Sequence, residues 1–107
     1  MQEMTPQAAF DAWQAGDVAI VDVREQDEYD TTRVDGMPLI PMSEFGGRAG
    51  EFPGELPLVI MCRSGRRSAQ VADALLTQGG RGDVRNLTGG IIAWAEAGLP
   101  YVGEPPQ

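Results

Sequence analysis

The sequence contains 107 residues, with no lysine and no histidine. Its 16 acidic side chains outnumber its 8 arginines, so its net charge is −8. This length suits one domain, and the negative charge argues against non-specific binding to nucleic acid. One cysteine, Cys62, excludes an internal disulfide and a Cys-x-x-Cys pair, and the lack of histidine excludes a Cys-His dyad. The same composition argues against a zinc or other metal site.

The start of the chain, "MQEMTPQAAF", lacks the basic head and apolar centre of a signal peptide. No apolar run approaches the ~20 residues that a helix needs to cross a bilayer. We therefore expect a cytoplasmic protein that does not interact with membranes.

The first half of the chain predicts two helices around a buried strand. Residues 5–16 form a helix with Thr5 as its N-cap and Pro6 at its first position. Residues 18–23, "VAIVDV", are β-branched and apolar, as in a strand covered on both faces. Residues 25–30 predict a short acidic helix with Tyr29 turned inward.

The middle of the chain is less regular. A short strand is expected near Leu39–Ile40, where Pro41 ends it, and a turn of helix is expected from Ser43. Glycine and proline make residues 46–57 a predicted loop.

The second half repeats the alternation of strand and helix. We expect strands at 58–61 and 83–87, a long helix at 68–78 and a shorter helix at 89–98 that ends at Gly98. Such alternation predicts an α/β fold in which helices cover both faces of a parallel sheet. Residues 1–102 are expected to form a single domain, followed by a flexible tail at 103–107.

The basic segment "CRSGRRS", residues 62–68, joins the strand at 58–61 to the helix at 68–78. Ligands of open α/β sheets bind at the carboxyl ends of the strands, where Cys62 lies. Free amides of the loop and the helix start bind anions, and Gly65 permits a tight curl. With the nearby arginines they favour a thiolate. The alternatives are a cysteine buried as a small apolar residue and a solvated basic turn.

The same motifs resemble the single-domain rhodanese family over nearly the whole chain. The matching segments are "VDVREQDEY", "DGMPLIPMSEF", "PLVIMCRSGRRSAQVADALLTQGG" and "VRNLTGGIIAWAEAG". The resemblance implies a three-layer α/β/α fold with a central five-stranded parallel sheet. It also implies that a persulfide on Cys62 carries sulfur from an anionic donor such as thiosulfate to a thiol or cyanide, without a cofactor.

The resemblance also assigns roles to residues. Cys62 is the expected nucleophile, and the rest of the loop is expected to bind substrate: Arg63, Ser64, Gly65, Arg66, Arg67 and Ser68. Among its arginines we expect Arg63 and Arg67, rather than Arg66, to face the pocket. Asp22 and Arg24 are expected to support the site by pinning loops beneath it.

Two positions depart from the family pattern. Arg33 stands where a histidine is common, and we expect it to be a surface cation paired with acidic neighbours. Glu28 stands where the two-domain thiosulfate and mercaptopyruvate transferases often have an arginine, which weakens the case for either small donor.

Related phosphatases close their loop on an arginine six residues after the cysteine, whereas here that residue is Ser68 and Arg67 lies at five. The loop is therefore one residue short of the phosphatase pattern. Two alternatives to a sulfurtransferase with small-molecule donors stay open. One is a relay that passes persulfide sulfur between proteins, and the other is an interaction module without turnover.

Overall fold

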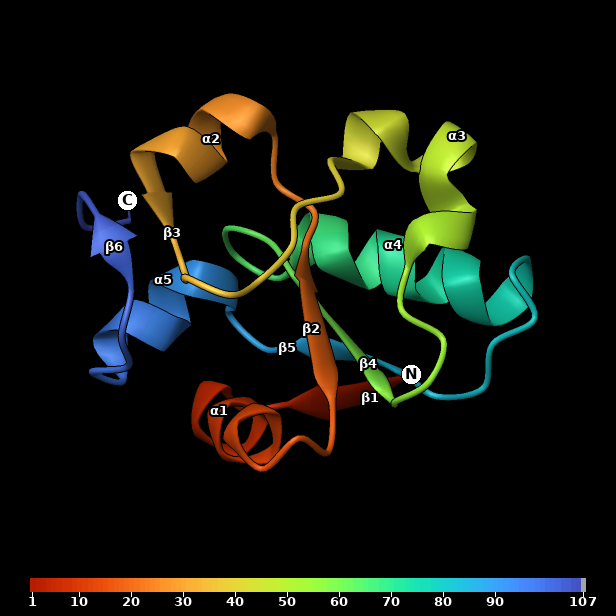
Figure 1. The fold of residues 1–107 in the computed structure, drawn as a ribbon, viewed down its shortest axis with the longest axis horizontal. Helices are drawn as coiled ribbons and strands as arrows, with labels where there is room; N and C mark the ends of the chain where they lie inside the picture. The colour runs from red at the N-terminus through yellow and green to blue at the C-terminus, as the bar shows by residue number, and fades with distance from the viewer. Residues whose placement is uncertain (107) are drawn as a thin grey trace.

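The computed structural model describes residues 1–106 as alternating strands and helices (Figure 1). Its helices are α1 (Pro6–Gln14), α2 (Gln26–Thr31), α3 (Phe45–Arg48), α4 (Arg66–Thr77) and α5 (Gly90–Glu96). Its strands are β1 (Gln2–Met4), β2 (Ala19–Asp22), β3 (Thr32–Arg33), β4 (Leu58–Met61), β5 (Val84–Leu87) and β6 (Val102–Gly103). Two 3-10 turns, at Met42–Glu44 and Ala49–Glu51, flank α3.

The main sheet is parallel throughout, with the strand order β1-β5-β4-β2. The sheet has four strands in the described residues, so the expectation of a regular five-stranded sheet is wrong in its count. In place of the strand expected at Leu39–Ile40, a single bridge pairs Leu39 with Asp22. Pro38 and Pro41 flank that bridge and have no amide to donate, which keeps the pairing from extending.

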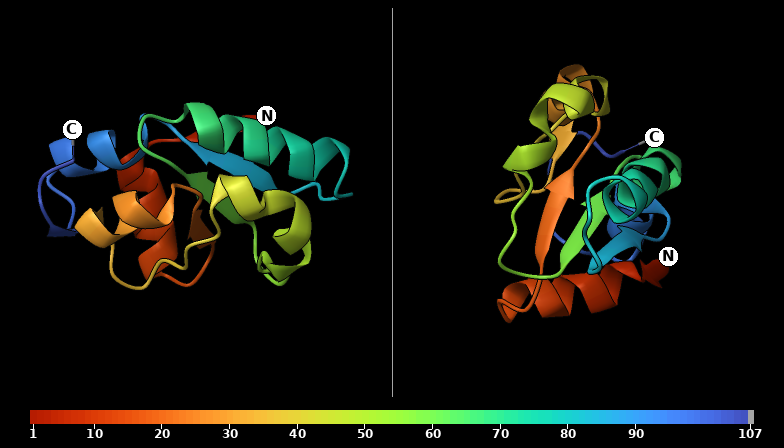
Figure 2. Two further views of the ribbon diagram at one scale, coloured as in Figure 1. Left: turned by 90° about the horizontal axis from the view of Figure 1, so that it is seen from above. Right: turned by 90° about the vertical axis from the view of Figure 1, so that its right-hand side faces the viewer.

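Two core clusters lie on opposite faces of the sheet. Alternating strand residues such as Val59 and Ile60 point to different clusters. One cluster packs under α1 and α5 around Trp94, which has no exposed surface. The other packs under α3 and α4 and includes Cys62. Figures 1 and 2 show α1 and α4 on opposite sides of the sheet, which confirms the three-layer α/β/α architecture.

Three local expectations need correction. The long helix begins at Arg66 rather than 68, because Gly65 with its φ of +97° already acts as the N-cap. The segment expected to be a loop at 46–57 holds most of α3 and the 3-10 turn Ala49–Glu51. No strand was expected before residue 18, yet the polar segment of β1 pairs with β5.

A second, two-stranded sheet joins the C-terminal segment to the body of the protein. In it, β6 pairs antiparallel with β3, so that Gly103 lies opposite Thr32. The amide of Glu104 donates to the Thr31 carbonyl (3.0 Å), and the Thr32 hydroxyl donates to the Glu104 carbonyl (2.6 Å). These contacts extend two residues beyond the domain boundary expected at 102.

Candidate active site

Cys62 lies directly after β4, at the carboxyl edge of the sheet, where the chain turns into α4. Its side chain is buried, with 1% of its surface exposed. The turn requires glycine at position 65, because φ is +97° there and a Cβ would lie 3.2 Å from the Gly89 amide nitrogen. The loop therefore curls tightly around the sulfur.

Two hydrogen-bond donors of this curl lie within reach of the sulfur atom. The Gly65 amide donates to Sγ at 3.1 Å, and the Ser68 hydroxyl lies 3.3 Å from it. Burial is the largest single influence on the thiol and opposes its ionisation. Hydrogen bonds from the Ser68 hydroxyl and from the amides of Ser68, Gly65 and Ser64 nevertheless hold the pKa of Cys62 below its ordinary value. These donors favour the thiolate form of Cys62 without a histidine.

The start of α5 holds the loop from the other side. The Ile91 amide donates to the Cys62 carbonyl (2.9 Å), and the Ile92 amide donates to the Arg63 carbonyl (3.2 Å). Gly90 makes this approach possible, because a Cβ there would press on both carbonyl groups. The Gly89-Gly90 pair, which was not among the site residues expected from the sequence, therefore supports the cysteine loop.

Ser68 and Asn86 connect the sulfur to β1 through buried polar groups. The Ser68 hydroxyl lies 2.6 Å from Asn86 Oδ1, and Asn86 Nδ2 donates to the carboxylate of Glu3 (3.2 Å) and to the Gly65 carbonyl (3.1 Å). Ser68 is fully buried and Asn86 is 4% exposed. Asn86 and Glu3 were not among the site residues expected from the sequence, although an asparagine inside a predicted strand was a visible signal.

The three loop arginines occupy different environments. Arg67 is paired with Glu28 of α2 through two hydrogen bonds of 2.6 and 2.8 Å. Those hydrogen bonds, stronger than the opposing effect of burial, lower the pKa of Glu28 to about 2. Arg63 is exposed and lines a pocket, and Arg66 is exposed at the first position of α4. The loop's positive charge at Arg67 is thus balanced by a carboxylate.

Asp22 and Arg24 form a buried ion pair that also binds neighbouring backbone groups. The Arg24 guanidinium donates to both carboxylate oxygens of Asp22 at 2.8–3.1 Å, and both side chains are buried. It also donates to the carbonyls of Thr32 (2.6 Å) and Glu28 (3.4 Å), which fixes α2 and β3 beside the end of β2. Arg33 lies on the surface, 3.6 Å from Asp35.

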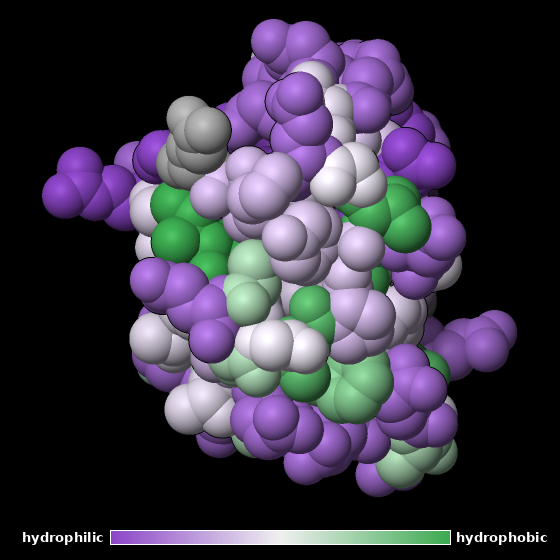
Figure 3. Space-filling view, turned by 90° about the vertical axis from the view of Figure 1, so that its left-hand side faces the viewer, coloured by the Kyte–Doolittle hydropathy of each residue, from purple (hydrophilic) through white to green (hydrophobic). Residues whose placement is uncertain are grey.

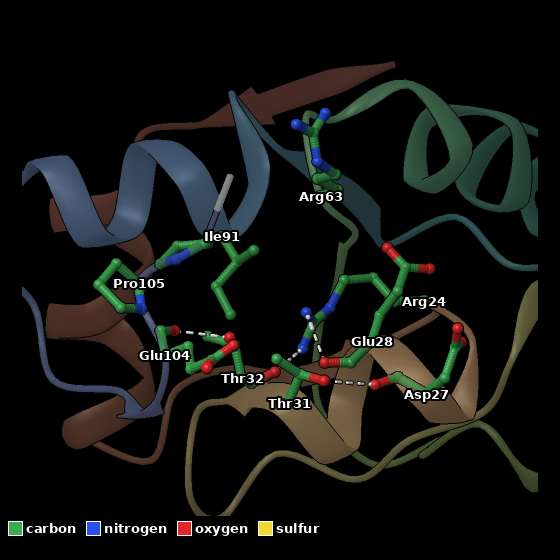
Figure 4. Close-up of a pocket in the computed structure, with 10 residues that line it drawn as sticks. Arg24, Asp27, Glu28, Thr31, Thr32, Arg63, Ile91, Glu104 and Pro105 are labelled. Carbon is green, nitrogen blue, oxygen red and sulfur yellow. Dashed lines mark hydrogen bonds between the residues drawn. The ribbon is translucent and has the colours of Figure 1, made fainter.

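A pocket of about 380 Å³ lies between the loop, α2, the start of α5 and the C-terminal segment (Figure 4). Arg63 and Ile91 border it on the loop side, and Asp27, Glu28 and Glu104 contribute carboxylates. The face that carries β6 is mainly hydrophilic, with its apolar residues in small separate groups (Figure 3).

The described residues, 1–106, contain neither a cluster of metal-binding side chains nor a membrane-spanning helix. No group of three or more His, Cys, Asp or Glu side chains among them is placed to hold a metal ion. None of the helices in this part of the chain has the length and apolar character needed to cross a membrane.

Comparison with known proteins identifies the class to which this fold and loop belong. The sequence pattern of the rhodanese-like domain matches residues 5–97, so the chain belongs to the rhodanese-like domain family. A sulfurtransferase of Allochromatium vinosum is 46% identical over 86 residues, which cover 80% of this chain and 79% of that protein. The thiosulfate sulfurtransferase GlpE of Actinobacillus succinogenes is 29% identical, over 92% of this chain and 87% of that protein.

Solved structures agree with this assignment. A rhodanese-related protein from Thermoplasma volcanium superimposes with a TM-score of 0.85 and 25% identity, over 97% of this chain and 100% of that one. The sequence-based resemblance to the rhodanese family is thereby confirmed, as is the α/β fold that it implied.

Proposed function

We propose that this protein transfers a sulfane sulfur from a donor such as thiosulfate to a thiophilic acceptor through a persulfide on Cys62. The Cys62 thiolate attacks the outer sulfur of thiosulfate, the sulfur–sulfur bond of the donor breaks, and sulfite leaves with the electron pair. A cyanide ion or an acceptor thiolate then attacks the outer sulfur of the persulfide. The Cys62 thiolate is the leaving group of that step, so the site returns to its starting state.

The observation that carries this proposal is the environment of Cys62 Sγ. Both half-reactions place negative charge on that atom, in the attacking thiolate and again in the leaving group. The Gly65 amide at 3.1 Å and the Ser68 hydroxyl at 3.3 Å are aimed at it. Hydrogen-bond donors placed around the atom on which negative charge develops stabilise that charge. The chain contains no histidine, and this chemistry needs no general base once the thiol is ionised.

The second candidate function is a relay of persulfide sulfur from one protein to another, and the Glu28–Arg67 ion pair favours it. Thiosulfate carries two negative charges, and Glu28 offsets one of the cations that would attract it. The relay uses the same persulfide on Cys62 and differs in its partners. An interaction module without turnover has less support, because cysteine and loop are both present.

Intact-protein mass spectrometry tests the proposed chemistry. After incubation with thiosulfate the protein should gain one sulfur atom, and cyanide should remove it. Cys62→Ser should show neither the gain nor turnover, while its circular dichroism stays that of the wild type. A serine variant that still consumed thiosulfate would contradict the mechanism.

Acceptor assays separate the two candidates. The persulfidated protein would be mixed with cyanide or with a thiol-containing partner protein, and the sulfur followed by mass. Efficient transfer to the protein, with slow loading from thiosulfate, would favour the relay. Hydrolysis of an aryl phosphate that Cys62→Ser abolishes would instead support a phosphatase, which the short loop argues against.

A further inference from the structure

The Ser68 hydroxyl has two acceptors and one proton. Its oxygen lies 2.6 Å from Asn86 Oδ1 and 3.3 Å from Cys62 Sγ, and the side chain is fully buried, so no bulk water replaces either contact. A hydroxyl donates one hydrogen bond at a time. When it donates to Asn86, its lone pairs face Sγ, which suits a thiol proton but not a thiolate.

The orientation of the Asn86 amide is fixed by its neighbours. Its Nδ2 donates to the Gly65 carbonyl at 3.1 Å and to the Glu3 carboxylate at 3.2 Å. Rotating the amide would turn Oδ1 toward those two acceptors and Nδ2 toward Ser68, leaving acceptors facing one another. The register of β1 on β5 places Glu3 directly opposite Asn86, and Thr88 also donates to Glu3 (2.8 Å). Oδ1 therefore stays aimed at the Ser68 hydroxyl.

We infer that Asn86 is a positioning residue that competes with the Cys62 thiolate for the Ser68 proton. While Sγ is a thiol or carries the outer sulfur of a persulfide, Ser68 donates to Asn86. When Sγ becomes a thiolate, the hydroxyl turns toward it and Asn86 Oδ1 loses its donor. Asn86 thus makes the thiolate less stable than the loop alone would make it.

This inference rests on the proposed function, in which Sγ gains negative charge each time sulfur leaves. In the transfer step the acceptor sulfur bonds to the outer sulfur and the bond from that sulfur to Sγ breaks, with the electron pair going to Sγ. The Ser68 proton stays on its own oxygen and changes its acceptor. A less stable thiolate is a poorer leaving group and a stronger nucleophile, so Asn86 adjusts the balance between loading and unloading.

Other charged groups near Cys62 influence its thiolate without any change in the hydrogen bond that Ser68 donates. Arg67 of α4, paired with Glu28 of α2, interacts electrostatically with the Cys62 thiolate. Arg63 follows Cys62 in the loop, and Arg24 beyond β2 is neutralised by Asp22. These groups remain in place when position 86 or 68 is changed, so a comparison of variants isolates the shared proton.

A double-mutant cycle between Asn86→Leu and Ser68→Ala tests the competition. Leucine has the same branching and number of side-chain heavy atoms as asparagine and offers no acceptor, so the Ser68 hydroxyl becomes free to donate to the thiolate. Iodoacetamide alkylation, followed against pH, should then begin at lower pH, with a rate on the acid side about three- to tenfold higher. Ser68→Ala should shift the profile to higher pH. In the Ser68→Ala background, Asn86→Leu should shift the profile much less, because no hydroxyl proton is left to share and only the loss of the Nδ2 contacts with Gly65 and Glu3 remains.

The matched control is Glu3→Ala, which removes the outer hydrogen bond of Asn86 but leaves Oδ1 and the Gly65 contact in place. It should move the profile much less than Asn86→Leu. If Asn86→Leu does not fold by circular dichroism, Asn86→Ala replaces it in the cycle.

Two results would overturn the inference. One is a profile for the Asn86 variant that is unchanged or shifted to higher pH. The other is a shift of the same size with and without the Ser68 hydroxyl. The mass gain with thiosulfate is measured separately, so a failure of the proposed sulfur transfer is distinguishable from a failure of this proton-sharing scheme.

Discussion

At the scale of single residues, hydrogen bonds from the loop are the interactions that favour the Cys62 thiolate. Its pKa is lowered by amides and a hydroxyl against the effect of burial, while the Arg67 cation is shared with Glu28. Because the folded pKa is below that of a free thiol, the thiolate should persist to lower pH than in a free cysteine. Alkylation of Cys62 should therefore begin at lower pH than alkylation of a cysteine-containing peptide.

Substitutions of Glu28 and Arg67 should shift the pKa of Cys62 in opposite directions. Arg67→Ala leaves an unbalanced carboxylate near the thiolate, so the pKa of Cys62 should rise and alkylation at pH 7 should slow about two- to fivefold. Glu28→Gln frees the guanidinium and should act in the opposite direction. Arg48→Ala is the control, because Arg48 is half-buried and paired with Glu44 and Glu51 in a different part of the surface. Equal profiles for all three variants would show that the loop charges do not reach the sulfur.

At the scale of secondary-structure elements, the site depends on the start of α5 packing against the cysteine loop. Gly90 has a φ of +62°, and a Cβ there would press on the carbonyls of Cys62 and Arg63. Gly90→Ala should therefore destabilise the fold by about 2–4 kcal/mol, from left-handed strain and overpacking, and should slow Cys62 alkylation. Urea unfolding measures the loss.

Gly46→Ala is the matched control for that change, because a Cβ at Gly46 has nothing within 4 Å and the backbone there has no positive φ. Its free energy of unfolding should stay within about 1 kcal/mol of the wild type. If Gly90→Ala were as harmless as the control, the close approach of α5 to the loop would not be needed for stability.

The elements that local sequence determines were predictable. Thr5 accepts a hydrogen bond from the Ala8 amide and Pro6 begins α1, as their residue types indicate. By contrast, β1 has a polar sequence and exists because β5, from the other end of the chain, pairs with it. The strand expected at Leu39–Ile40 reduces to one bridge because prolines interrupt it.

The candidate site likewise has a part that the local sequence predicted and a part that it did not. Its loop, residues 62–68, could be read from one contiguous segment with its cysteine, glycine and arginines. Its remaining partners come from distant positions: Glu28 and Arg67 are 39 residues apart, and Glu3 and Asn86 are 83 apart. A single sequence carries no signal for such pairs, because they depend on strand register and on how α2 lies against α4.

At the scale of the whole molecule, the C-terminal segment closes one wall of the pocket. Residues 103–104 continue the pairing with β3, and the next two residues, Pro105 and Pro106, line the pocket beside Thr31 and Glu104. This segment is therefore both an edge of the fold and part of the wall of the pocket that Arg63 borders.

Truncation after Val102 tests whether this segment belongs to the folded unit. It removes the hydrogen bonds that Glu104 makes with Thr31 and Thr32 through its backbone, so the free energy of unfolding should fall by about 1–3 kcal/mol. Glu104→Ala keeps both backbone bonds and should stay within about 0.5 kcal/mol of the wild type. Urea unfolding of the three proteins distinguishes a structural strand from a loose tail. Equal stability of the truncated and full-length chains would place the end of the domain at 102 and make the β3–β6 pairing incidental to the fold.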